Sequence, residues 1–246
     1  MKRLVLAAFA VTFAAIVAAP FALAQRTQLI TVHYNERFPY MYEEEGALKG
    51  LTATRVIAAL DAAGLNYRWI ETPAARQLTL IEQNSGADCG IGWFKNNQRE
   101  RFAQFSDALY QDQPIAILTR TAHPLFRSNR TLHDVLADRR LILNTKVGYS
   151  YGEFLDYLIA EYDPVSLQSA AENLTLFRQI ATGRADYMFV APEEAEAVFA
   201  LPDLSAAQFQ LLTPPDMPDG EERYLMCSMN VDPRTIALFN RALANL

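Results

Sequence analysis

The sequence predicts an α/β protein made of two lobes that are joined by structured strands. In the first half of the chain, segments with strand composition alternate with segments of helical period, and the second half repeats this alternation. No Gly/Ser-rich linker, low-complexity tract or fixed-period repeat separates the halves. We therefore expect two layered α/β units with hinge strands between them.

The first half is predicted to alternate strands and helices, beginning strand–helix–strand–helix–strand. Strands are expected over residues 28–33, 66–71, 88–94 and 114–119. Helices are expected over residues 51–63 and 73–82, where apolar residues recur at helical spacing, with a short helix over 98–105. Gly64 is predicted to end the first helix, because glycine commonly follows the last helical turn.

The second half repeats the pattern with more helix. Strands are expected over residues 141–143, 184–190 and 223–229. Helices are expected over residues 150–160, 173–182, 193–199 and 233–243. Ser150 and Glu153 form the S-x-x-E pattern of a capping box, which predicts that the first of these helices begins at Ser150.

The N-terminus has the pattern of a secretory signal peptide. Lys2 and Arg3 precede an almost wholly apolar run over residues 4–20, and small residues precede Gln25. A basic start, an apolar core and an A-x-A-like end predict cleavage after Ala24, so residues 1–24 would be removed on export. A retained membrane anchor is the alternative, because the apolar run is about as long as the shortest spanning helix.

The charge balance excludes some classes of partner. Without residues 1–24, the chain loses two of its 22 basic residues and none of its 28 acidic residues, which leaves a net charge of −8. Nucleic acids and anionic membrane surfaces are bound through clustered Lys and Arg. We therefore expect neither as a partner.

Signatures of common enzymes and cofactor sites are absent from the sequence. There is no G-x-G-x-x-G, P-loop, G-x-S-x-G or H-E-x-x-H motif, and the three histidines are far apart. No catalytic residue, cofactor or metal is predicted. Cys89 and Cys227, the two cysteines, either form a disulfide, which an oxidising compartment favours, or remain buried thiols.

Aromatic residues accompany single charges after three of the expected strands. Open parallel α/β sheets bind ligands at the carboxyl ends of their strands. The three groups are Tyr34, Arg37, Phe38 and Tyr40; Trp93, Phe94 and Arg99; and Tyr149, Ser150, Tyr151 and Gly152. The third group lies at an expected helix start, where backbone N–H groups and the helix dipole favour an anion. Their recurrence predicts a ligand site.

Four segments resemble one family. Residues 88–110 resemble the strand, Arg and F-S-x-x-Y signature of type II periplasmic solute-binding proteins, the extracellular family 3 typified by polar amino-acid receptors of ABC importers. Residues 37–60 resemble the aromatic–Pro–aromatic opening and first helix of that family. Residues 182–199 resemble its G-R-x-D segment, and residues 223–243 its return strand and helix. The similarity covers most of the mature chain.

The resemblance implies the two-lobed type II periplasmic-binding-protein fold. Lobe one is then expected over residues 25–115, lobe two over 116–222, and a return to lobe one over 223–246. The implied function is capture of a small polar or carboxylated solute by a periplasmic monomer, with an ABC permease as membrane partner. The resemblance also implies that a disulfide between Cys89 and Cys227 lies within lobe one or at its hinge edge.

The resemblance assigns ligand contacts by position. Arg99 falls on the Arg that clamps a ligand carboxylate, for which a guanidinium is suited through two parallel hydrogen bonds. The other implied ligand-binding residues are Tyr34, Arg37, Phe38, Arg76, Trp93, Tyr149, Ser150, Tyr151 and Gly152. Of these, Arg37 and Phe38 lie where stacking on the ligand is common, and Tyr149 to Gly152 match the helix start that meets the carboxylate.

The sequence departs from amino-acid receptors at the ammonium site. The Asp that holds the α-ammonium is replaced by Ala191, which Pro192 follows, so only Glu193 and Glu194 could substitute. An aromatic, carboxylated or otherwise uncharged polar solute is then as fitting as an α-amino acid.

Two other functions remain open. The same fold hosts periplasmic dehydratases of the cyclohexadienyl dehydratase type, for which Glu36, Glu71 and Glu193 are the acid or base candidates. A sensory receptor that works without a transporter is the other.

Overall fold

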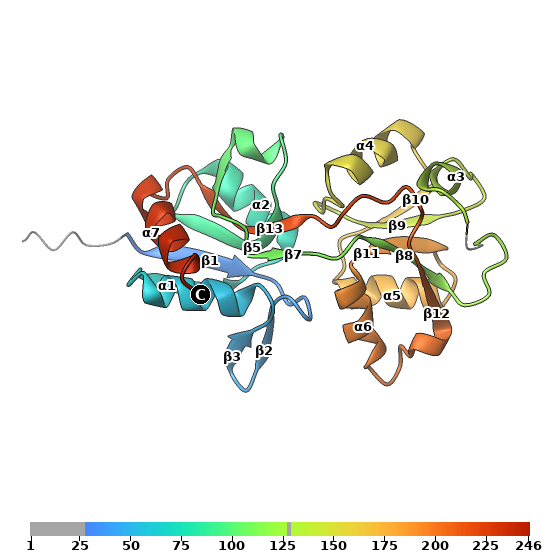
Figure 1. Cartoon of the computed structure of the whole chain (residues 1–246), viewed down its shortest axis with the longest axis horizontal. Coiled ribbons are helices and arrows are strands. Elements are labelled where there is room, and N and C mark those ends of the chain that lie inside the picture. Colours follow the sequence, from blue (N-terminus) through green and yellow to red (C-terminus); the bar gives the residue numbers. More distant parts are fainter. Residues whose placement is uncertain (1–27, 127–128) are drawn as a thin grey trace, which may run out of the picture.

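The computed structural model describes residues 28–126 and 129–246, which form two α/β lobes lying side by side along the long axis (Figure 1). Lobe one is built on a six-stranded sheet and lobe two on a five-stranded sheet. The two-lobed α/β prediction is therefore confirmed. The signal peptide expected at residues 1–24 lies outside the described residues. Within the described ranges, no helix is long and apolar enough to cross a membrane.

The sheet of lobe one has the strand order β4-β1-β5-β13-β6, and β7 also pairs with β13. The bounds are β1 (Ile30–Tyr34), β4 (Tyr67–Glu71), β5 (Asp88–Phe94), β6 (Ala103–Phe105), β7 (Tyr110–Gln111) and β13 (Glu222–Ser228). Strands β4, β1 and β5 are parallel, whereas β13 is antiparallel to β5, β6 and β7. Every residue of β1 is buried, as expected for a strand with neighbours on both edges and helices on both faces.

Helices cover both faces of this sheet. Helices α1 (Ala53–Ala62) and α7 (Pro233–Leu243) pack on one face, and α2 (Ala74–Gln83) packs on the other. Successive residues of β13 serve opposite faces, since Leu225 and Cys227 join the first core and Met226 joins the second. A hairpin of β2 (Tyr42–Glu44) and β3 (Ala47–Lys49) precedes α1.

Lobe two repeats the layered design with the strand order β10-β9-β11-β8-β12. The bounds are β8 (Ala116–Arg120), β9 (Leu143–Lys146), β10 (Ser166–Ser169), β11 (Tyr187–Val190) and β12 (Phe209–Leu212). Helices α3 (Leu132–Leu136) and α4 (Glu153–Tyr162) cover one face, and α5 (Asn173–Ala181) and α6 (Pro192–Phe199) cover the other. A short 3-10 turn (Ala206–Gln208) leads into β12.

Most of the expected elements are present, and the differences have tertiary causes. The helix expected over residues 98–105 is wrong: a 3-10 turn (Arg99–Arg101) is followed by β6, whose residues pair with β13. Strands β2, β3, β10 and β12 and the short helix α3 were not anticipated. Strands β10 and β12 lie at the sheet edges and are only partly buried, so their apolar pattern is weak.

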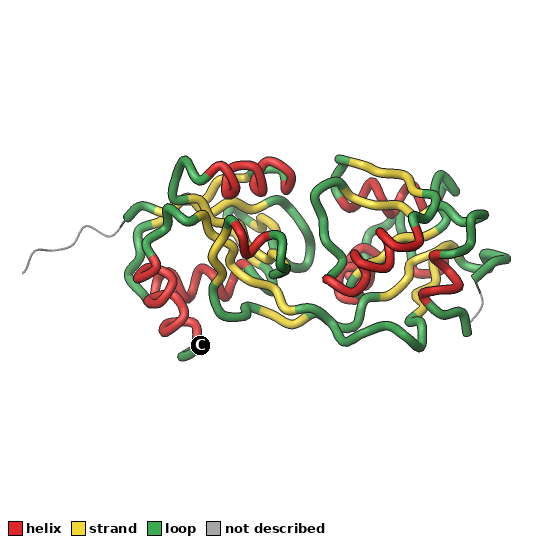
Figure 2. Tube along the Cα trace, turned by 90° about the horizontal axis from the view of Figure 1, so that it is seen from above, coloured by secondary structure: helices red, strands yellow, loops and turns green. Residues whose placement is uncertain are grey.

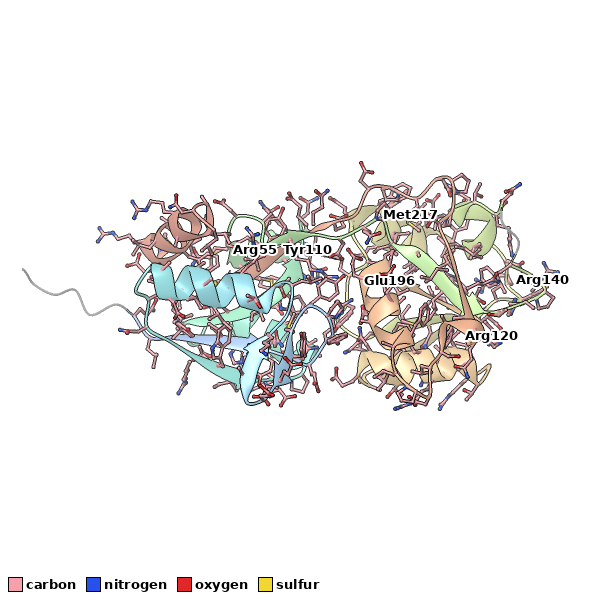
Figure 3. All side chains as sticks on the ribbon, turned by 60° about the horizontal axis from the view of Figure 1, so that its bottom comes forward. Arg55, Tyr110, Arg120, Arg140, Glu196 and Met217 are labelled. Atoms are coloured by element: carbon pink, nitrogen blue, oxygen red, sulfur yellow. A yellow bond between two sulfur atoms is a disulfide. The ribbon has the colours of Figure 1, made fainter. Side chains whose placement is uncertain are left out.

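Two adjacent chain segments join the lobes, one leaving β7 and one entering β13 (Figures 1 and 2). Figure 3 labels Tyr110, which begins the first of these segments. Asp112 N donates to Glu221 O at 3.0 Å, which ties the two segments together. A Cβ at Gly220 would lie 1.8 Å from Asp112 O, so this close approach requires glycine.

A buried ion pair fastens this hinge to lobe one. Arg223 donates from Nε and Nη2 to the two carboxylate oxygens of Asp112, at 2.6 Å each, and both side chains are almost fully buried. The Arg223 guanidinium also donates to Gly92 O at 3.0 Å and lies 3.8 Å from the ring centre of Tyr40. The pair therefore connects the hinge to the end of β5.

Asp112→Asn should destabilise the protein strongly. The substitution leaves the Arg223 charge buried without a counter-charge, and removing one partner of a buried pair costs about 3–5 kcal/mol. Urea unfolding measures the loss, and Asp107→Asn, at an exposed position nearby, is the matched control. An unchanged unfolding midpoint would contradict the role given to this pair.

A disulfide joins Cys89 of β5 to Cys227 of β13. The two residues are directly opposite in the strand register, and their Cα atoms are 4.0 Å apart. Both are fully buried in the core beneath α1 and α7. The bond thus lies within lobe one, and it links neighbouring strands without crossing between the lobes.

Replacing both cysteines with alanine is expected to lower the unfolding free energy. In the chain-entropy account, a bond that closes a loop of this length contributes up to about 5 kcal/mol. Scanning calorimetry of the double variant and of the reduced wild type should show the same lowered transition. Melting of the double variant at the wild-type temperature would refute this expectation.

Candidate functional site

A small cavity lies where the lobes meet, at the carboxyl ends of the lobe-one strands. Its volume is about 40 Å³. Asn35 and Arg37 follow β1, Trp93 is the penultimate residue of β5, and Arg99 lies in the turn after β5. Tyr149 and Ser150 of lobe two line it from the other side. This is the strand edge at which open α/β sheets place ligands.

A β-bulge at Gly92 turns the end of β5 toward the cavity. The register with β13 shifts between Tyr224 and Leu225, and Gly92 has φ +75°, a backbone region that glycine adopts at little cost. Trp93 beyond the bulge donates from Nε1 to Gln77 Oε1 at 3.1 Å. The indole ring is thereby held as one wall of the cavity.

Arg99 is a buried cation at this site. It is 6% exposed, and it donates from Nη1 to Phe94 O at 2.7 Å and from Nη2 to Gly148 O of lobe two at 3.5 Å. Its guanidinium lies 4.8 Å from the ring centre of Trp93. Burial lowers the pKa of Arg99 to about 10, so the group is still charged at neutral pH. Within the described residues, no carboxylate forms an ion pair with it.

Arg37 forms a buried ion pair with Glu194 of helix α6, across the two lobes. Nη2 lies 2.7 Å from Oε2, and Nε lies 3.2 Å from each carboxylate oxygen. Burial by itself would raise the pKa of Glu194, but the Arg37 charge and a hydrogen bond from Asn173 hold it below its ordinary value. Glu194 is therefore a carboxylate, and Arg37 its main partner.

Asn35 offers an unpaired donor beside the cavity. Its Oδ1 accepts from Gln77 Nε2 at 3.2 Å, while its buried Nδ2 has no hydrogen-bond partner in the structure. Buried polar groups are nearly always paired, so an unpaired donor in a cavity wall indicates a place for an acceptor.

Lobe two contributes a tight turn between β9 and α4. Ser150 Oγ donates to Asp156 Oδ2, and Tyr151 N donates to Asp156 Oδ1 at 2.8 Å. The expected capping box is wrong, because α4 begins at Glu153 and its N-cap, Gly152, makes no side-chain cap. With φ +97°, Gly152 turns the chain between Ser150 and the helix, and Ser150 Oγ accepts from Gly152 N at 3.3 Å instead of from the first turn of α4.

Five of the residues predicted as ligand contacts lie on the cavity wall: Arg37, Trp93, Arg99, Tyr149 and Ser150. The others lie elsewhere in this closed arrangement. Tyr34 donates from its hydroxyl to Glu43 at 3.4 Å, and Phe38 is 47% exposed beside Tyr42.

Arg76 is exposed on α2, and Gly152 begins α4. The hydroxyl of Tyr151 accepts from Lys146 N at 3.1 Å.

Sequence reasoning missed Asn35 and Arg223, which also line the cavity. Asn35 directly follows Tyr34, the predicted contact at the same strand end, and it is Asn35 that lines the cavity in this structure. Arg223 is a charged residue that directly precedes the apolar run of β13, a signal that indicates a buried partner.

The lobes are closed on each other in this structure. Besides the Arg37–Glu194 pair, Asn97 Nδ2 of lobe one donates to Glu153 Oε1 of lobe two at 2.6 Å. A second hollow of about 220 Å³ shares Arg99, Tyr149 and Ser150 with the cavity. Small-molecule sites occupy about 300–1,000 Å³. Entry of a ligand therefore requires the lobes to separate.

Acid should favour the open arrangement of the lobes. The pKa of Glu194 is lowered in the closed structure, so the closure energy from the pair is complete above the ordinary value of 4.5 and is lost as the pH falls below it. Small-angle scattering should show a larger radius of gyration at low pH. Glu194→Gln should be more open than wild type at pH 7 and change less with acid.

Glu196→Gln, on the exposed side of the same helix (Figure 3), is the matched control and should behave as wild type. Equal scattering of wild type and Glu194→Gln at pH 7 would show that the pair does not hold the lobes together.

No protein-family model matches the sequence, and no curated protein sequence is similar to it. Solved structures are similar in fold. The arginine-, lysine- and histidine-binding protein ArtJ from Geobacillus stearothermophilus has a TM-score of 0.71 at 17% identity, over 89% of each chain. The GluR0 ligand-binding core from Nostoc punctiforme, in complex with L-glutamate, has a TM-score of 0.68 at 16% identity, over 88% of this chain and 92% of that one.

A third similar structure is the ancestral amino-acid-binding protein AncCDT-1, a precursor of cyclohexadienyl dehydratase. Its TM-score is 0.67 at 15% identity, over 89% of this chain and 88% of that one. The three likenesses extend over both lobes and the hinge between them. The chain therefore has the two-lobed fold of the type II periplasmic binding proteins.

Proposed function

We propose that this protein is a solute-binding protein that captures a small carboxylate-bearing solute between its lobes. The observation that carries the proposal is Arg99, a buried cation on the cavity wall that has no ion-pair partner among the described residues. A buried charge is costly unless it is paired. A ligand carboxylate would supply the missing partner, and a guanidinium can hold it with two hydrogen bonds.

The surroundings of Arg99 suit such a ligand. Asn35 Nδ2 is a second donor on the same wall, and Trp93 and Tyr149 present aromatic surface from the two lobes. Donors fix the orientation of a polar ligand, whereas aromatic surface contributes most of the buried area. The site thus combines an anion-binding end with apolar walls.

The hinge supplies the mechanism of capture. In the open arrangement, a ligand would bind Arg99 and Asn35 of lobe one, and Tyr149 and Ser150 of lobe two would then close on it. Contacts that exist only after closure bias the equilibrium toward the closed state. The disulfide lies within lobe one, so it stiffens that lobe without opposing the rotation.

The similar structures support reversible capture. ArtJ binds basic amino acids, and the GluR0 core holds glutamate in its solved complex. With the signal-peptide pattern, the proposal places the mature protein in the periplasm as a monomer of extracellular family 3, delivering its solute to an ABC permease. A receptor that reports to a separate partner would use the same capture step.

An enzymatic role of the dehydratase type has less support. General acid catalysis needs a protonated carboxyl within reach of the substrate. Arg37 keeps Glu194 ionised, and Glu193 Oε1 accepts from Tyr110 Oη at 2.8 Å and from Gln113 N at 2.9 Å at the hinge. Glu194 is thus held in a structural contact, and so is Oε1 of Glu193, whereas Glu193 Oε2 is buried without a hydrogen-bond partner.

Arg99→Ala should abolish tight binding while leaving the fold intact. Native mass spectrometry of protein from the periplasm would identify a co-purified solute, and titration calorimetry would measure its affinity. Loss of one partner of a buried charge pair costs about 2–5 kcal/mol, which is a loss of about 30-fold or more in affinity.

Arg101→Ala is the matched control, because Arg101 is exposed in the same short turn. A thermal-shift panel of small carboxylates gives a second measurement, since ligand at about 100 times its Kd adds about 2.7 kcal/mol of stability. Wild-type affinity in Arg99→Ala would refute the site.

A further inference from the structure

Glu194 is the acidic side chain of lobe two at the cleft, and its hydrogen-bonding capacity is already used. Arg37 donates to both of its oxygens, and Asn173 Nδ2 donates to Oε1. The Glu194 side chain is 2% exposed, and that of Arg37 is 16% exposed. The guanidinium lies between the rings of Tyr40 and Tyr149, at 5.2 and 5.0 Å from their centres. Both members of the pair are therefore fixed in place.

Two other carboxylates near the cavity are also engaged, whereas Glu193 Oε2, at the hinge, is buried without a hydrogen-bond partner. Asp112 accepts both bonds of Arg223, and Asp156 accepts from Ser150 and from Tyr151 N. The carbonyl oxygens of Gly92 and Phe94 accept from Arg223 and Arg99. On the cavity wall, Arg99 has no carboxylate within ion-pair distance among the described residues, and the buried Asn35 Nδ2 has no hydrogen-bond partner.

The availability of donors and the shortage of acceptors at the cavity should favour carboxylates without an ammonium group over those that carry one. An ammonium group carries a positive charge and three donors but no acceptor. In this cleft it would lie near Arg37 and Arg99, while the Glu194 carboxylate is already bonded to other donors. A buried unpaired donor costs about 1–3 kcal/mol, or more when charged. An oxo or hydroxyl oxygen at the same carbon could instead accept from Asn35.

From this we infer that Arg37 sets the ligand class of the cleft: it takes the place of a ligand ammonium at Glu194, so the site selects carboxylates that lack an α-ammonium. The inference deepens, and rests on, the proposed capture of a carboxylated solute. An α-amino acid could pair with Glu194 only by displacing Arg37, which would leave that guanidinium without its counter-charge.

Matched pairs of probes test the selection in the wild-type protein. Titration calorimetry would compare phenylpyruvate with phenylalanine, 2-oxoglutarate with glutamate, and pyruvate with alanine. We expect the 2-oxo acid to bind at least about tenfold more tightly than its amino acid, a difference of about 1.4 kcal/mol. This measurement requires no substitution, so it does not depend on how any variant folds.

Arg37→Gln tests the residue itself. Removing the cation exposes Glu194 to the ligand, so the ratio of affinities should move toward the amino acid by about tenfold or more. The double variant Arg37→Gln/Glu194→Gln should lose this gain, and Glu194→Gln alone should not show it. Arg55→Gln, on the outer face of α1 (Figure 3), is the matched control and should keep the wild-type ratio.

Three results would overturn the inference. Two of them leave the proposed function intact, and the third overturns it as well. If wild type prefers the amino acids and Arg99→Ala abolishes that binding, the proposed capture of carboxylates stands and the role of Arg37 is wrong. An unchanged ratio in folded Arg37→Gln has the same meaning. If no carboxylate binds wild type, in this panel or as a co-purified solute, the proposed function fails and the inference fails with it.

Discussion

The arrangement of the two lobes depends on one buried ion pair, between Asp112 and Arg223. Asp112 lies on the segment that leaves lobe one and Arg223 on the strand that returns to it, so their two hydrogen bonds hold the hinge segments side by side. The same guanidinium bonds Gly92 O, beside the bulge that turns Trp93 and Phe94 toward the cleft. The Arg223 side chain thus contacts both the hinge segments and the end of β5 that forms one wall of the site. A substitution of Arg223 or Asp112 is therefore expected to alter the hinge and that wall together.

The main feature of this cleft is an excess of positive charge on the cavity wall. Arg37, Arg99 and Arg223 line the cavity, and Glu194 and Asp112 pair with the first and the last of them. Arg99 bonds backbone carbonyls and lies over an aromatic ring, and its nearest carboxylate influence is the charge of Asp156, which forms no ion pair with it among the described residues. Burial makes this imbalance costly, because a buried charge has lost most of its hydration. An anion that enters the closed cleft would restore the balance, which is the physical basis of the proposed carboxylate capture.

Residues that are adjacent in the sequence occupy different environments at the site. Tyr34 ends β1 and Asn35 directly follows it, but Tyr34 lies against Glu43 whereas Asn35 lines the cavity. Side chains alternate along a strand, so a shift of one residue exchanges the core side for the ligand side, and sequence composition does not reveal which residue faces the cleft. The same limit applies to Ser150, whose S-x-x-E spacing indicated a helix cap. The turn at Gly152 delays the helix and directs Ser150 to Asp156 instead.

The sequence by itself determined the α/β alternation, the two lobes with strand connections and the positions of the strand ends that carry Trp93 and Arg99, because these follow from local composition and periodicity. The sequence also indicated that its two cysteines could form a disulfide. Only the pairing of β5 with β13 placed Cys89 opposite Cys227. The tertiary structure alone decided that Arg37 would meet Glu194, 157 residues later in the chain, and that Arg99 would stay without such a partner. Which residues pair over such a distance in the sequence depends on how the two lobes pack and on how much water the packing excludes. Neither quantity can be read from a local sequence pattern.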